Sequence, residues 1–186
     1  KGNKVWFTKS NDTKRKLKYT LQIIEVNGSK IGVNTHLTNK IFYEALLSNK
    51  IINLKKTDIL FREKQFNKNT RFDFFIKQKD KGCFIEVKNV TLSRFKNIAE
   101  FPDAVTERGL KHIRELMEAK KKGFDVYLAF IIQREDCKRF KIAEDIDLNY
   151  KKLLTVALKN DLKIICYDCK FLPKDIIINN KINIIK

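Results

Sequence analysis

Glycine and proline are scarce in this sequence, with 6 Gly and 2 Pro among 186 residues. Because these residues cluster in linkers and low-complexity tracts, no such segment divides the chain. There are four cysteines and only two histidines, and the histidines lie far apart with no Cys or His at ligand spacing, so a zinc site is not expected. We expect the cysteines to be reduced thiols. Glycine-rich phosphate loops and serine-hydrolase motifs are also missing, which excludes those enzyme classes.

Long hydrophobic runs are absent as well. The run from Tyr127 to Ile132 is far shorter than the roughly 20 residues of a membrane-spanning helix. The sequence starts at Lys1 without an initiator Met and without the basic-then-apolar pattern of a signal peptide. We therefore expect a fragment of a cytoplasmic protein with no membrane partner, and the sequence leaves open whether copies of it associate.

Acidic residues are few relative to basic ones. Asp and Glu number 22 against 40 Lys and Arg, which gives a formal net charge of +18 at pH 7. Such a charge produces a strongly positive surface field. Polyanions, above all nucleic acids, are the expected partners.

The order of the elements predicts an α/β fold with a mixed central sheet flanked by helices. A small β segment comes first, with an Asn27-Gly28 hairpin turn, and Thr38 is a candidate cap for the helix after it. From that helix onward the order is αβββαβαβ. The expected helices are 39–48, 104–122 (starting near Asp103) and 148–160, and the expected strands are 5–8, 19–26, 30–33, 59–66, 70–76, 83–90, 125–133 and 162–167.

Three ionisable residues on two of these strands form the main candidate site. If the hairpin turns about Lys79-Asp80, Asp73 lies opposite Glu86, and Lys88 points to the same face as Glu86. In that register the opposite face is entirely apolar, which supports the pairing. The apolar set is Phe72, Phe74, Ile76, Cys83, Ile85 and Val87.

Two carboxylates facing each other repel unless a cation lies between them. Mg²⁺ or Mn²⁺ fits this position, because Mg²⁺ binds a few carboxylates together with water and phosphate oxygens. Lys88 would then act on the water or stabilise the charge that develops at phosphorus. The alternative is a solvent-facing salt bridge across the two strands.

Glu44 on the first helix and Gln133 at the end of the apolar strand complete an αβββαβ order that resembles the PD-(D/E)XK nuclease core. Several collinear stretches also resemble the sugar fermentation stimulation protein A (SfsA) family. These stretches are Arg15–Thr20, Gly32–His36, Arg71–Asp73, Glu86–Leu92, Phe101–Gly109 with Lys111-His112, and Ile132–Asp136.

The SfsA resemblance implies an OB-like domain followed by a PD-(D/E)XK nuclease-like domain. Residues 1–34 would be the end of the OB-like domain, most of which is missing, and residues 35–186 the nuclease-like domain. By the same resemblance, Asp73 and Glu86 would bind the metal, Lys88 would act at the water, and Glu44 and Gln133 would complete the pocket.

The function implied is DNA binding linked to sugar fermentation, with a divalent-metal-dependent nuclease as the leading hypothesis. The alternative is a non-catalytic DNA-binding transcriptional regulator of sugar (maltose) metabolism. A third hypothesis is that the chain binds or cleaves RNA.

Basic residues in two places are candidates for phosphate contacts. The first group combines cations with an aromatic ring that could stack on a base, and the second lies at the start of the helix 104–122. The two groups are Lys14, Arg15, Lys16, Lys18 and Tyr19, and Arg108 and Lys111. An ordinary solvated basic segment is the alternative for the first group.

Overall fold

A computed structural model describes residues 2–52, 54, 59–77 and 81–185 of the chain. Its helices are α1 (Leu37–Leu47), α2 (Glu107–Lys121) and α3 (Leu148–Lys159). The strands are β1 (Val5–Lys9), β2 (Tyr19–Val26), β3 (Ser29–Gly32), β4 (Ile59–Asn67), β5 (Thr70–Lys77), β6 (Gly82–Val90), β7 (Leu92–Phe95), β8 (Ile98–Phe101), β9 (Asp125–Ile132), β10 (Arg139–Ile142), β11 (Lys163–Phe171), β12 (Ile176–Lys181) and β13 (Asn183–Ile184). None of these helices is long and apolar enough to span a membrane.

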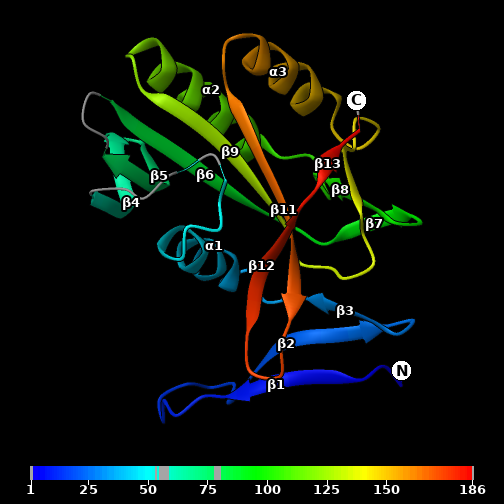
Figure 1. Cartoon of the computed structure of the whole chain (residues 1–186). Coiled ribbons are helices and arrows are strands. Elements are labelled where there is room, and N and C mark those ends of the chain that lie inside the picture. The colour runs from blue at the N-terminus through cyan, green and yellow to red at the C-terminus, as the bar shows by residue number, and fades with distance from the viewer. Residues whose placement is uncertain (1, 53, 55–58, 78–80, 186) are drawn as a thin grey trace.

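A mixed six-stranded sheet forms the centre of the molecule, in the order β12-β11-β9-β6-β5-β4 (Figure 1). Strands β6, β9 and β11 are parallel, and the flanking strands run antiparallel to their neighbours. The β9 strand is almost entirely buried, as expected for a strand covered on both faces. The predicted α/β fold with a mixed central sheet is confirmed.

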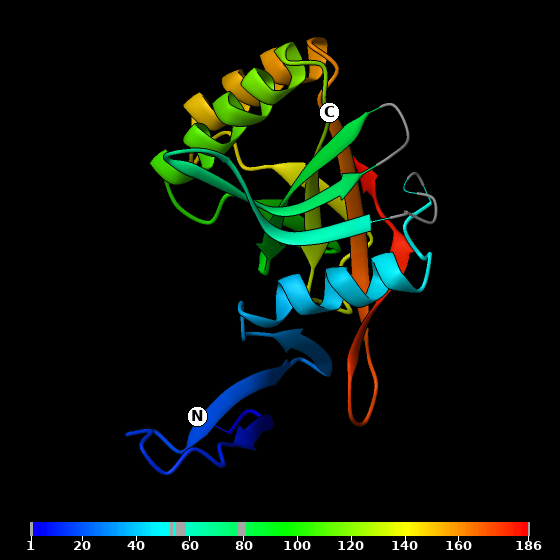
Figure 2. The same cartoon turned by 90° about the vertical axis from the view of Figure 1, so that its left-hand side faces the viewer.

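Helices cover both faces of this sheet (Figures 1 and 2). On one face, α2 and α3 pack against it through residues such as Leu116 and Tyr150, both fully buried. On the other face, α1 contributes Phe42, whose ring lies 5.5 Å from that of Phe74. Burial of these side chains is the main force that fixes the helices to the sheet.

The expected register between β5 and β6 is confirmed where the two strands pair. Phe74 pairs with Ile85 and Ile76 with Cys83, as predicted, although the turn at Lys79-Asp80 lies outside the described residues. The prediction that Phe72 shares a face with Phe74 is wrong. Phe72 packs against Phe66 and Phe84 in the α2 and α3 layer, whereas Phe74 belongs to the α1 layer.

A break in the regular sheet at Asp73 explains this change of face. The β5–β6 pairing ends at Phe74, and on β4 the residue between the partners of Phe72 and Phe74 is Glu63, whose φ is 49°. A left-handed residue within a strand interrupts the pleat, so strict alternation of faces fails there. The sheet is therefore irregular at the candidate site.

The helix starts also differ from the sequence prediction. Thr106 caps α2 by accepting a hydrogen bond from the Gly109 N–H, so α2 starts after Thr106 and not near Asp103. Thr38 lies inside α1, where its hydroxyl donates to the Thr35 carbonyl and therefore does not cap the helix. The N-terminus of α1, at His36, has no side-chain cap, whereas α2 is capped by Thr106.

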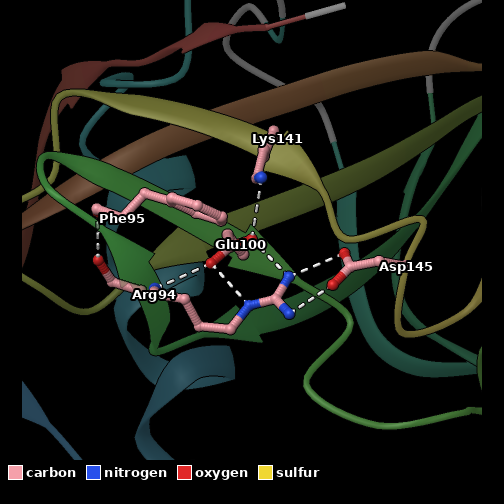
Figure 3. A network of polar contacts seen from close by, with 6 residues as sticks. Arg94, Phe95, Glu100, Lys141 and Asp145 are labelled. Carbon is pink, nitrogen blue, oxygen red and sulfur yellow. Dashed lines mark hydrogen bonds and ion pairs between the residues drawn. The ribbon is translucent and has the colours of Figure 1, made fainter.

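A second sheet, β13-β10-β8-β7, was not predicted. It is held by a polar network in which the Arg94 guanidinium contacts Glu100 at 2.8 Å and Asp145 at 2.6 Å (Figure 3). Lys141 lies 3.3 Å from the same Glu100 carboxylate. Burial alone would raise the pKa of Glu100, but these cations lower it overall.

The first three strands form a separate antiparallel sheet. Its predicted hairpin turn is confirmed, because Asn27 and Gly28 have φ of 50° and 77° and join β2 to β3. The Gly32 N–H donates to the Gln133 carbonyl at 2.9 Å, which attaches β3 to the chain after β9. The small sheet lies at the end opposite α2 and α3 in both views (Figures 1 and 2). The boundary at 34/35 between an OB-like and a nuclease-like domain stays a prediction.

Candidate functional site

A polar cavity of about 280 Å³ lies where the start of α1 meets β5, β6 and the first turn of α2. Four of the residues singled out from the sequence line it: Asp73, Glu86, Lys88 and Arg108. The remaining lining residues are Thr35, His36, Thr38, Asn39, Val87 and Asn89. The structure therefore brings the two carboxylates and the lysine together in one cavity.

The Asp73 carboxylate is held in place by two donors. Its Oδ1 accepts from Asn39 Nδ2 and its Oδ2 from the Val87 main-chain N–H, both at 2.7 Å. Burial, and after it the charge of Glu86, raise the pKa of Asp73 to about 6, although these hydrogen bonds oppose the shift. Burial therefore contributes most to the raised pKa, and the neighbouring Glu86 charge adds to it.

Glu86 is 4% exposed and contacts two cationic or potentially cationic groups. Its Oε1 accepts from Lys88 Nζ at 2.7 Å and also contacts His112 Nδ1, and Lys88 Nζ lies 2.9 Å from that nitrogen. Burial alone would raise the pKa of Glu86, but the contacts with His112 and Lys88 lower it overall. Glu86 is thus an ionised carboxylate at neutral pH. The buried triad it forms differs from the solvent-facing salt bridge considered above.

The donor set suits a small, hard divalent cation. Both contacts of Glu86 use Oε1, so Oε2 has no hydrogen bond within the described residues. Each Asp73 oxygen accepts one hydrogen bond and keeps a further lone pair. No cluster of three His, Cys, Asp or Glu side chains arranged to hold a metal occurs in the described part of the chain. Mg²⁺ needs only one or two carboxylates, because water and phosphate oxygens fill its other positions.

Gln133 lies behind the cavity and does not line it. Its side chain is fully buried, and its Nε2 donates to Thr38 Oγ1 at 2.9 Å and to Asn89 Oδ1 at 2.6 Å. Thr38 and Asn89 themselves line the cavity. Gln133 therefore positions cavity residues instead of meeting a substrate directly.

Glu44 does not reach this cavity, contrary to the sequence expectation. It lines a different hollow beside β1 and pairs with Lys40 at 3.5 Å. The α1 residue that faces Asp73 is Asn39. Five residues further along a helix, a side chain is rotated by about 140° and displaced by about 7.5 Å. Glu44 therefore cannot share the position of Asn39.

The two predicted groups of phosphate-binding residues lie in different parts of the molecule. Arg108 lines the cavity, and Lys111, one turn along α2, donates from Nζ to the Asn69 carbonyl at 2.7 Å. The other group lies on the exposed β1–β2 connection and the start of β2, and none of its members lines the cavity. This group is Lys14, Arg15, Lys16, Lys18 and Tyr19.

Two side chains that contact Asp73 or Glu86 were not among the predicted site residues. Asn39 carries no signal beyond lying in the first turn of the predicted helix. His112 was given no role in the site by the sequence analysis, yet it contacts both Glu86 and Lys88. The signal for His112 was its place next to Ile113 on the buried side of α2, where a polar side chain needs a partner.

The fold and cavity define an α/β protein whose mixed central sheet carries two carboxylates and a lysine in one polar cavity. Residues 36–175 match the family described as "Sugar fermentation stimulation protein RE domain". The sugar fermentation stimulation protein homolog of Pelagibacter ubique is 47% identical over 184 residues, which covers 99% of this chain and 79% of that protein. The homolog of Sinorhizobium medicae is 35% identical over 177 residues, which is 95% of this chain and 74% of that protein. The chain belongs to the SfsA family.

A solved structure shows the same fold. The structure of Pyrococcus furiosus SfsA in complex with Ca²⁺ superposes with a TM-score of 0.87 at 24% sequence identity. The match covers 98% of this chain and 78% of that one. Both the small β1–β3 sheet and the central sheet are therefore part of the shared fold.

Proposed function

We propose that this chain is a divalent-metal-dependent nuclease that binds DNA and hydrolyses its phosphodiester bonds. The observation that carries the proposal is the convergence of Asp73, Glu86 and Lys88 in one cavity. The lining of the cavity supports it, because two carboxylates that share a cavity favour a cation between them.

Each residue has a distinct role in this proposal. Asp73 and Glu86 would hold Mg²⁺ or Mn²⁺, with Asn39 keeping the Asp73 carboxylate oriented through its 2.7 Å hydrogen bond. The metal would polarise the scissile phosphate and supply a nucleophilic water at neutral pH. Lys88 would stabilise the negative charge that develops on the phosphate oxygens. The Pyrococcus furiosus relative is described in complex with Ca²⁺, another hard cation with oxygen ligands.

The choice of nucleic acid as substrate is supported by charge. The net charge of +18 attracts polyanions, and Arg108 lines the cavity beside the proposed metal ligands. The names of the relatives link the family to sugar fermentation. We propose that this chain acts in the same process, on DNA and in the cytoplasm.

One observation favours a second candidate, a non-catalytic DNA-binding regulator of sugar metabolism. Lys88 and His112 both contact Glu86 Oε1 and already compensate its charge without a metal. In a regulator this triad would be purely structural, and phosphate contacts alone would bind DNA without any need for a divalent ion.

Cleavage assays distinguish the two candidates. Labelled single- and double-stranded DNA and RNA are incubated with Mg²⁺ or Mn²⁺, using the wild type, Glu86→Gln and Asp73→Asn. The nuclease proposal expects DNA cleavage that EDTA and either substitution abolish, while binding of DNA in EDTA persists. Salt-sensitive DNA binding with no cleavage under any metal condition would reject the nuclease and support the regulator. Preferential cleavage of RNA would reject DNA as the substrate.

A further inference from the structure

A second hollow of about 480 Å³ lies next to the candidate active site, between the β4–β5 turn and the start of α2. Four basic side chains line it: Lys68, Arg71, Arg108 and Lys111. We call this hollow the basic groove. Arg71 and Lys68 were not among the binding residues expected from the sequence.

The basic groove is continuous with the candidate active site. Arg108 lines both hollows. His112 lines the basic groove and contacts Glu86 and Lys88, which line the cavity. A chain molecule bound at the carboxylates could therefore reach the basic groove, since Arg108 would meet it in both hollows.

The charge in the basic groove is largely uncompensated. Glu63 is the acidic residue on its wall, and among the described residues no ion pair joins any of the four cations to a carboxylate. Like charges gathered this way repel one another, and a polyanion relieves that repulsion. The ligand class that fits is therefore one with several negative charges in a row.

The wall of the groove is also shaped by fixed contacts. Lys111 Nζ donates to the Asn69 carbonyl, and Asn67 Nδ2 donates to Glu115 Oε2 at 2.6 Å, so the β4–β5 turn is attached to α2. The buried hydroxyl of Thr70, also on the wall, has no hydrogen-bond partner in the described part of the structure. An attached wall keeps Lys68 and Arg71 at a defined distance from the cavity, as a binding site requires.

We propose that the basic groove binds the phosphates of a DNA strand adjacent to the phosphate held in the cavity. This inference rests on the proposed function for the position of the scissile phosphate. It adds that the substrate is a polynucleotide whose phosphates next to the cleaved bond are bound by the basic groove. Lys68 and Arg71 contact phosphates there and take no part in the chemistry.

The test compares two variants that each lose positive charge from exposed positions. Arg71→Gln removes one groove cation, and Lys77→Gln is the matched control, because it removes one exposed cation from the other end of the same β5 strand. Binding of a fluorescent single-stranded oligonucleotide is measured in EDTA across a series of salt concentrations, so that no cleavage is needed. A small diester, bis(p-nitrophenyl) phosphate, is hydrolysed with Mn²⁺ in parallel.

The expected result follows from counterion release. Each lost phosphate contact should lower the magnitude of the log–log salt slope by about 0.7, which corresponds to about a fivefold loss of affinity at 0.1 M salt. The control should change affinity by less than about twofold. Hydrolysis of the small diester, which occupies only the cavity, should be unchanged in the groove variant.

Equal losses in the groove variant and in Lys77→Gln would overturn the inference, because general charge alone would then explain binding. No loss in the groove variant would overturn it as well. If the groove variant binds less tightly but the wild type cleaves no substrate, the groove stands as a DNA-binding surface and the nuclease proposal fails.

Discussion

Replacing Gly32 by alanine tests whether the network behind the cavity is as tightly packed as the structure shows. A Cβ at position 32 would overlap Gln133 Oε1 and lie 3.1 Å from Gln133 Cβ. Gln133 is fully buried, so its side chain has no free space into which to withdraw. The added methyl group must therefore displace Gln133 or separate β3 from the chain after β9.

The magnitude follows from the contacts that displacement breaks. Gln133 Nε2 donates to Thr38 and Asn89, and each buried polar group left without a partner costs about 1–3 kcal/mol. We expect Gly32→Ala to lower the free energy of unfolding by about 2–4 kcal/mol. In a chain of this size each kcal/mol shifts Tm by about 2–4 °C.

Urea denaturation and thermal unfolding measure this loss. Gly28→Ala is the matched control, because Gly28 lies in the hairpin leading to β3, has φ of 77° and would bring its Cβ near no other atom. Backbone strain alone should make that control about 1 kcal/mol less stable. In a Gln133→Ala background the cost of Gly32→Ala should shrink, since the clashing atom is gone. Equal costs for Gly32→Ala and Gly28→Ala, or full additivity with Gln133→Ala, would refute the packing described.

Three further predictions concern ionisation, metal and thiols. The lowered pKa of Glu100 means that its ionised form stabilises the folded protein above the ordinary value of 4.5 and that this stability is lost as pH falls. Glu100→Gln should therefore be less stable than wild type at pH 7, and the difference between their urea midpoints should narrow toward pH 3. A difference that stays constant with pH would contradict the ion pair between Glu100 and Arg94. Mg²⁺ or Mn²⁺ at about 100 times its Kd should stabilise the wild type by about 2.7 kcal/mol in thermal unfolding and should leave the stability of Glu86→Gln unchanged. An equal increase in the stability of both proteins would show that the ion binds elsewhere. The free cysteines are buried, and burial raises the pKa of Cys83 to about 12, so thiol reagents should label the protein only after denaturation. Rapid labelling of the folded protein would contradict this, because it would show that thiol reagents reach the buried cysteines.

The hydrophobic pattern was sufficient to predict five strands of the central sheet, but the edge strand β12 was not among the expected strands. Alternation along Phe74–Ile76 and Cys83–Ile85 set the β5–β6 register, and the apolar run of β9 indicated a strand covered on both faces. The pattern failed at Phe72, because the left-handed Glu63 on the neighbouring strand interrupts the alternation. Nothing in the residue types around Glu63 signals that break.

The second sheet escaped prediction for a different reason. Strands β7, β8 and β10 have four residues each, too short for alternation to distinguish them from loop. They are stabilised instead by long-range polar contacts, of which Arg94 with Asp145 is one (Figure 3). Contacts between residues so far apart in sequence are invisible to any local pattern.

At the candidate site, too, local sequence patterns predicted the residues on the strands but not the contacts made from a neighbouring helix. Asp73, Glu86 and Lys88 were predicted to share a face, and the structure brings them to one cavity. The α1 residue in contact with Asp73 depends on where the helix begins and how it is rotated, and Glu44 was expected where Asn39 lies. Helix rotation about its own axis is set by packing against the sheet, here through Phe42.

Diffraction from crystals soaked in Mn²⁺ tests the central claim most directly, because the ion's anomalous signal locates it independently of activity. The account predicts one strong peak in the cavity, about 2.0–2.3 Å from carboxylate oxygens of both Asp73 and Glu86. A saturating soak that leaves the cavity without a peak, with Glu86 still bonded to Lys88 and His112, would contradict the metal site and with it the nuclease.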